Sequence, residues 1–246
     1  MLAALAACSA TACAQEAAPV TPYRPSVSTP AQLPAPGQLE FEFGALAARG
    51  RQPARDSLPY TFKLAFDKDW GVLLGGEALV HTRDGGAAAT GIGDTSLVLK
   101  RAFIVNDASA FGLELGVKVP TASSAIGSGK ADWTINTIYS RDFGDLHMDA
   151  NLNATRLGAP DAGAARMQTG ASASFSVPLD ERWSATGELS GLHNAGAPTS
   201  AQVLAALGYM PNKRLALDFG LTRGLAPGAA RWSLFTGMVV PLANLR

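Results

Sequence analysis

The stretch from Asp94 to Thr155 constrains the fold most, because its apolar residues alternate with small or polar ones through four consecutive segments. In residues 111–119, Phe, Leu and Val alternate with Gly, Glu and Lys, and residues 146–153 repeat the pattern. Successive strand side chains point to opposite faces, so each segment has one apolar and one polar side. A soluble sandwich hides the apolar side in a core, whereas a membrane barrel turns it towards lipid.

From Gln38 onward the same alternation predicts twelve strands. Their expected ranges are 38–48, 58–66, 70–81, 93–104, 109–119, 132–142, 145–156, 166–177, 182–192, 201–210, 214–222 and 231–241. No motif repeats with the period of a solenoid or a propeller, so the regularity is that of consecutive hairpins.

The connections between these strands alternate in length along the whole chain. Short ones carry turn-forming residues, as in 67–69, 106–107 and 211–213. Long ones, such as 120–131 and 157–165, are rich in Gly, Ala, Pro and Ser. Antiparallel strands put alternate connections at opposite ends, and outer-membrane barrels have short periplasmic turns and long outer loops. The pattern therefore favours the membrane barrel over the sandwich.

Aromatic residues gather beside both kinds of connection, which predicts two rings at the two membrane interfaces. The residues expected in these rings are Tyr60, Trp70, Phe103, Trp133, Phe143, Trp183, Tyr209 and Trp232. An even number of strands also closes without an open edge, which hydrocarbon would not tolerate. We therefore expect an all-β protein, a twelve-stranded antiparallel up-and-down transmembrane β-barrel over 38–246, in the outer membrane. The last residues, 241–246, lack the terminal aromatic that is usual for such barrels.

The first 37 residues differ from this pattern. Residues 1–14 are rich in Ala and Leu and end in Ala12-Cys13-Ala14, which predicts a secretory signal peptide. It is short and lacks a basic region, which leaves a start further upstream open. Leu5-Ala6-Ala7-Cys8 also resembles a lipoprotein box, so a lipidated Cys8 is an alternative. Residues 15–37 carry six prolines and few large apolar residues, and we expect an extended, poorly ordered periplasmic linker.

The charged residues of the strands fall at the alternate positions that form the polar face. This predicts a charged lumen, because a basic side chain facing lipid at mid-depth would cost ~2–4 kcal/mol. The densest group comprises Asp94, Lys100, Glu114, Lys118, Asp132 and Asp149. One interpretation is a salt-bridged plug that fills a narrow interior. The other is a constriction that orients a passing solute. Arg101 and Arg141 fall on the outward parity and are expected to reach the short-turn interface.

Other classes of function have little support. The 20 basic and 20 acidic residues balance, which gives no reason to expect nucleic acid as a partner. Both cysteines lie in the first 14 residues, and the three histidines are not expected to converge, so we expect no metal and no cofactor. Residues 127–130 lack the first glycine of a phosphate loop, and no nucleophile motif is present, so an enzyme is not expected.

Three glycine-rich motifs resemble a known family. Gly91-Ile92-Gly93-Asp94-Thr95, the run 115–121 followed by Gly127-Ser128-Gly129, and Gly220-Leu221-Thr222 are similar to the outer-membrane family named for the meta-pathway of phenol degradation. The resemblance covers about 90–222. It implies a transporter-like barrel that passes small, often aromatic or hydrophobic, molecules, and it brings no catalytic residues.

Two functions follow as expectations. The first is a passive channel for small molecules, aromatic or hydrophobic ones included, with lipid, solute and the barrel assembly machinery as partners. The second is a closed structural or binding barrel whose lumen is filled by side chains and which transports nothing. A twelve-stranded interior is compatible with both.

Overall fold

The structure is a computed structural model that describes residues 18–50 and 53–245. The expected signal peptide, residues 1–14 with Cys8, lies outside these ranges. Within them, no helix is long and apolar enough to cross a membrane.

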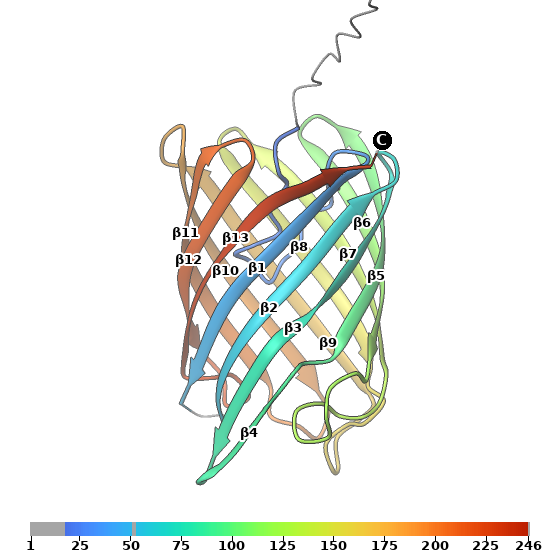
Figure 1. Cartoon of the computed structure of the whole chain (residues 1–246), viewed down its shortest axis with the longest axis vertical. Coiled ribbons are helices and arrows are strands. Elements are labelled where there is room, and N and C mark those ends of the chain that lie inside the picture. The colour runs from blue at the N-terminus through green and yellow to red at the C-terminus, as the bar shows by residue number, and fades with distance from the viewer. Residues whose placement is uncertain (1–17, 51–52, 246) are drawn as a thin grey trace, which may run out of the picture.

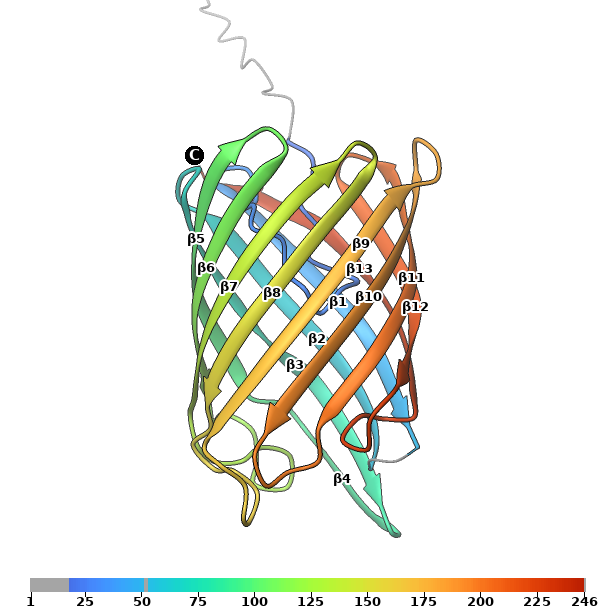
Figure 2. The ribbon, with the colours of Figure 1, turned by 180° about the vertical axis from the view of Figure 1, so that it is seen from behind.

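The described residues form thirteen antiparallel strands in one sheet. The strands are β1 Gln38–Arg49, β2 Ala54–Ala65, β3 Trp70–Asp84, β4 Ala87–Gly91, β5 Thr95–Asn106, β6 Ser109–Val119, β7 Asp132–Phe143, β8 Leu146–Arg156, β9 Met167–Pro178, β10 Trp183–Asn194, β11 Ser200–Asn212, β12 Leu215–Gly224 and β13 Trp232–Asn244. The sheet runs from β2 through β1 and β13 round to β3, and because β2 also pairs with β3, it closes on itself (Figures 1 and 2). The twelve-stranded up-and-down barrel expected from the sequence is confirmed.

The extra strand β4 is the one element that the alternation does not predict. It pairs only with the far end of β3, so it lengthens a hairpin beyond the barrel wall (Figure 1). The turn is Gly85-Gly86, with φ of 53° and 94°, which only glycine adopts readily. The segment 82–92, expected to be an irregular loop, is therefore mostly paired strand.

Burial in this barrel is inverted relative to a soluble domain. Large apolar side chains lie on the outside, with Leu152 at 65% and Leu115 at 50% exposed. The most deeply buried large side chains are Lys63, Lys100 and Glu40, each 1% exposed or less. An apolar exterior around a charged interior is the arrangement of a membrane barrel, not of a sandwich.

The two barrel ends differ as the connection lengths predict. The short turns lie at one end, where Asp67 Oδ1 accepts hydrogen bonds from the backbone N–H groups of Asp69 and Trp70, both at 2.8 Å. Asp180 does the same for Arg182 and Trp183. Such Asx turns close a hairpin in few residues. The long loops lie at the opposite end, and the C-terminus lies at the short-turn end (Figure 1).

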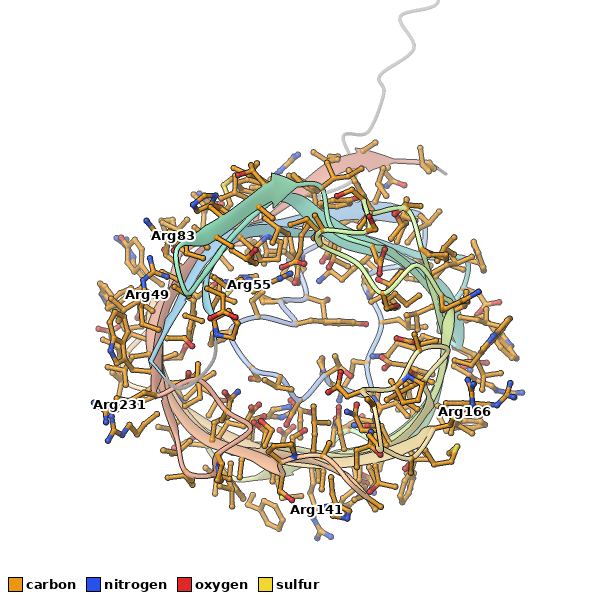
Figure 3. The ribbon with its side chains drawn as sticks, turned by 90° about the horizontal axis from the view of Figure 1, so that it is seen from below. Arg49, Arg55, Arg83, Arg141, Arg166 and Arg231 are labelled. Carbon is orange, nitrogen blue, oxygen red and sulfur yellow. The ribbon has the colours of Figure 1, made fainter. Side chains whose placement is uncertain are left out.

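The segment preceding β1 departs from the sequence expectation. Residues 18–37 run inside the barrel and contact its wall instead of forming a poorly ordered periplasmic linker (Figures 1 and 3). Val20 and Tyr23 are 5% and 7% exposed, and Ala31 is fully buried. The physical reason is the excess of acidic side chains on the lumen wall, which need donors that the segment supplies. We call residues 18–37 the lumen segment.

Candidate functional site

The lumen segment is bound mainly through its backbone N–H groups, which donate to wall carboxylates. Thr21 N–H donates to both carboxylate oxygens of Glu40, at 3.0 and 3.2 Å, and Tyr23 N–H donates to Glu42 at 2.8 Å. On the other side of the barrel, a single Glu188 oxygen accepts the N–H groups of Val27 and Ser28, both at 2.8 Å. Hydrogen bonds to a charged acceptor are among the stronger ones in proteins.

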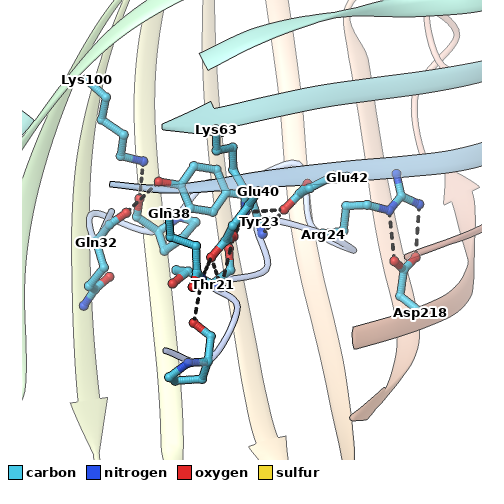
Figure 4. A network of polar contacts seen from close by, with 12 residues as sticks. Thr21, Tyr23, Arg24, Gln32, Gln38, Glu40, Glu42, Lys63, Lys100 and Asp218 are labelled. Carbon is cyan, nitrogen blue, oxygen red and sulfur yellow. Dashed lines mark hydrogen bonds and ion pairs between the residues drawn. The ribbon is translucent and has the colours of Figure 1, made fainter. Parts of the chain in front are cut away.

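One cationic side chain of the segment adds a bidentate ion pair. The Arg24 guanidinium donates through Nε and Nη2 to the two oxygens of Asp218 on β12, at 2.9 and 3.0 Å (Figure 4). The guanidinium fits because the wall residues next to it have no side chains. A Cβ on Gly44 would lie 2.8 Å from the guanidinium, and a Cβ on Gly237 only 2.3 Å from it. These two glycines make the close approach possible.

The side chain of Tyr23 lies between two buried lysines. The Lys63 and Lys100 ammonium groups each lie 4.2 Å from the ring centroid, a cation–π distance, and the Tyr23 hydroxyl donates to the Gln32 carbonyl at 2.7 Å (Figure 4). Lys63 also pairs with Glu40 at 3.0 Å and Glu42 at 2.6 Å. The ring therefore fixes the segment at the most charged level of the barrel.

The six residues expected to form one lumen cluster all face inward but divide into two groups. Lys100 and Glu114, register partners on β5 and β6, pair at 2.9 Å at the level of the lumen segment. Asp149 lies at the same level, accepting a hydrogen bond from Ser140, whose hydroxyl in turn accepts the N–H of Ala31 at 2.8 Å.

The second group lies at the long-loop end. Lys118 pairs with Asp94 at 3.1 Å and with Asp132 at 2.9 Å. The same side chains hold loops: Asp94 accepts the N–H of Ala122 at 3.0 Å, and Asp132 accepts the N–H of Gly158 at 2.8 Å. Lys118 therefore does not join the network of Glu114 and Asp149, and its group secures the outer loops over the barrel mouth.

Space remains on both sides of the lumen segment. A cavity of about 330 Å³ lies between the segment and the short-turn ends of β8 to β12, lined by His147, Ser176, Thr186 and Met210 among others. A second cavity, of about 220 Å³, lies against β1 to β3, with Pro59, Tyr60 and Leu73 in its lining. Tyr23, Arg24 and Ser26 line both cavities, so they stand at the boundary between them.

The histidines do not converge. His147 lies between Asp142 and Asp149, while His81 and His193 contact Thr90 and Thr199. Among the described residues, no group of three or more His, Cys, Asp and Glu side chains could hold a metal ion.

The expected aromatic rings are largely at strand ends. Trp70, Trp183 and Trp232 are the first residues of β3, β10 and β13, and Trp133 and Phe143 lie at opposite ends of β7. The Tyr209 ring packs against the Trp183 ring, with centroids 4.6 Å apart and planes tilted by 36°. Tyr60 differs, because β2 begins at Ala54 and not at residue 58, which leaves Tyr60 half way along the strand.

The two outward arginines lie where the parity predicts. The Arg101 guanidinium lies 4.9 Å from the Trp70 ring and 4.6 Å from the Phe103 ring, and Arg141 lies 5.0 Å from Phe143. The ring contacts of both arginines are near short turns.

The residues that sequence reasoning missed are those of the lumen segment, above all Tyr23 and Arg24. A signal was available in the wall itself. Glu40, Glu42, Glu188 and Asp218 all fall on the inward parity, with too few inward cations to match them. Unpaired buried carboxylates are costly, so an additional donor element inside the barrel is implied.

Comparison with known proteins shows the fold. No family model and no curated protein matches the sequence. Among solved structures, the COG4313 outer membrane channel from Pseudomonas putida F1 is similar with a TM-score of 0.67 at 13% identity, covering 86% of this chain and 97% of that chain. The KdgM porin in complex with disordered oligogalacturonate gives 0.56 at 10% identity, covering 84% and 99%. The CymD monoaromatic hydrocarbon channel gives 0.50 at 10% identity, covering 86% and 90%.

The chain therefore has the fold of outer-membrane channels and porins. The closed wall and apolar exterior agree with this likeness, and the expected location in the outer membrane is confirmed.

Proposed function

We propose that this chain is a passive outer-membrane channel for small molecules whose path is closed at mid-depth by the lumen segment. The observation that carries the proposal is the pair of cavities of about 330 and 220 Å³ separated by Tyr23, Arg24 and Ser26. A barrel serving only as a scaffold has no need for space on both sides of the lumen segment.

The lining of the lumen offers polar groups to a solute. The wall beside the lumen segment carries the carboxylates of Asp149 and Asp218 and hydroxyls such as Ser176 and Thr186, alongside the apolar Met210, Leu217 and Val239. The resemblance to the meta-pathway family and the likeness in fold to a monoaromatic hydrocarbon channel support the aromatic alternative. Comparison of a pentose sugar with an aromatic solute of similar size that does not cross the bilayer by itself, such as benzenesulfonate, separates these two solute classes in a liposome-swelling assay.

The closed structural barrel remains the second candidate, because the lumen segment fills part of the interior and donates hydrogen bonds to the wall carboxylates of Glu40, Glu42 and Glu188. The test uses full chain in planar bilayers, as the parent and as Arg24→Ala. Loss of the bidentate pair with Asp218 should loosen the segment and raise the mean conductance several-fold. Arg141→Ala, on the outer wall, is the control and should not change it. If neither the parent nor Arg24→Ala conducts, the closed barrel is the better description.

A further inference from the structure

Two exposed arginines lie at adjacent strand ends on the long-loop rim of the outer wall. Arg156 is the last residue of β8 and points outward, in register with Trp133 on β7 and Met167 on β9. Arg166 immediately precedes β9 and also points away from the barrel (Figure 3). Trp133 and Met167 are 60% and 53% exposed, so the two guanidinium groups border an apolar surface.

The charges of both arginines are uncompensated. Neither forms an ion pair with any described carboxylate, Asp161 of the adjoining loop included. Arg166 uses one nitrogen, Nη1, to donate to the Gly158 carbonyl at 2.9 Å and more weakly to that of Leu157 at 3.5 Å. Arg156 makes no side-chain hydrogen bond to another described residue. The remaining N–H donors of the two guanidinium groups face the exterior of the barrel.

An apolar groove of about 570 Å³ leads from Arg156 along the membrane-facing wall. Arg156, Trp133 and Met167 line its long-loop end. Leu99, Leu115 and Ile135, on β5, β6 and β7, line its floor. Those three floor residues are 39–50% exposed, as expected of side chains that meet lipid. The groove therefore has a cationic group at its long-loop end and an apolar surface along the rest of its length.

The long-loop end of such a barrel faces the outer leaflet, where the phosphates of lipopolysaccharide lie at the headgroup level. Arg binds phosphate through its planar fork of donors, and interfacial Trp is common at headgroup depth. We propose that the groove beneath Arg156 and Arg166 binds lipid A, with its phosphate on the two guanidinium groups and an acyl chain along Leu115.

The test measures binding of three probes to the full chain in detergent by native mass spectrometry. The probes are lipid A with its phosphates, the same lipid A after phosphatase treatment, and phosphatidylethanolamine. The variants are Arg156→Gln with Arg166→Gln, and the matched control Arg141→Gln, an outward arginine at the opposite rim. A heat-modifiability gel confirms that each variant is folded.

An interfacial arginine contributes about fivefold to the affinity for an anionic headgroup. The double variant should therefore bind phosphorylated lipid A about 25-fold more weakly, while Arg141→Gln should match the parent. Replacing both arginines by lysine should restore only part of the affinity, because the charges return but the planar forks that bind phosphate do not. Equal weakening in Arg141→Gln, or equal affinity for dephosphorylated lipid A or phosphatidylethanolamine, would overturn the proposal.

Discussion

At the scale of single residues, the two lumen lysines on neighbouring strands have different surroundings. Lys100 is fully buried against Glu114, whereas the Lys118 side chain is 31% exposed between Asp94 and Asp132. Removing one partner of a buried pair costs about 3–5 kcal/mol, and an exposed pair contributes about 0–1 kcal/mol. Lys100→Ala should therefore lower the free energy of unfolding far more than Lys118→Ala in urea titrations. Equal losses would show that the two environments are alike.

Adjacent residues on β6 test the two faces of the wall. Leu115 is half exposed to lipid, while Gly116 faces the lumen, where an added Cβ would meet its nearest neighbour, Val98, at an ordinary 3.5 Å. Leu115→Arg should block assembly, because a cation near mid-depth on the lipid side costs about 2–4 kcal/mol. Gly116→Arg should assemble better. Heat-modifiability gels on both variants give the comparison, and identical behaviour would contradict the assigned faces.

At the scale of elements, the alternation of short turns and long loops predicts the orientation of the barrel in the membrane. Ser124, Ala162 and Ala197 lie in long loops, whereas Lys68 and Asp107 lie in short turns. Single cysteines at the loop positions should react with a membrane-impermeant maleimide on intact cells. Those at the turn positions should react only after the outer membrane is opened. Reaction of both sets on intact cells would rule out this orientation.

The short turns themselves make a prediction about pH. The pKa of Asp180 is lowered because its carboxylate accepts the backbone N–H groups of Arg182 and Trp183. A lowered pKa means that the carboxylate stabilises the turn at pH values above its unfolded pKa and loses this effect as pH falls through the folded pKa. NMR titration should give a midpoint for Asp180 below the ordinary value of about 3.9. A midpoint at or above that value would mean that the turn hydrogen bonds do not form.

At the scale of the whole molecule, the lumen carries an acidic band. At the level of the lumen segment, six carboxylates (Glu40, Glu42, Glu114, Asp149, Glu188, Asp218) face the cationic groups of Lys63, Lys100 and Arg24. Any current through the parent should prefer cations, and Arg24→Ala should strengthen that preference by removing one positive charge. Reversal potentials in a KCl gradient measure it. A shift towards anions would mean that the current does not pass this band.

The fold was predictable from sequence and the site only partly. Strict alternation, as in 111–119, defines the two faces of a strand, so most strands and their faces could be assigned from the sequence, whereas β4 and the start of β2 could not. Alternation also placed Lys100, Glu114 and Lys118 on the inward face, but it could not say which of them pair, because that depends on the register between neighbouring strands. The lumen segment has no such periodicity, and its position depends on backbone N–H groups, which every residue except proline carries. Sequence composition therefore says nothing about which carboxylates they bind.

The lumen segment acts as an intramolecular ligand, because it is part of the same chain as the wall that binds it. It is tied near both ends at the short-turn mouth, where Val20 N–H donates to the Lys213 carbonyl at 2.9 Å and Gly37 N–H to the Ala65 carbonyl at 2.8 Å. A tethered ligand of this kind faces its site at an effective concentration on the order of millimolar. If the segment leaves its site, its return is consequently a unimolecular step. The lifetime of the open state therefore does not depend on protein concentration. A diffusing solute that competes for the same carboxylates must therefore reach millimolar concentration or bind them much more tightly.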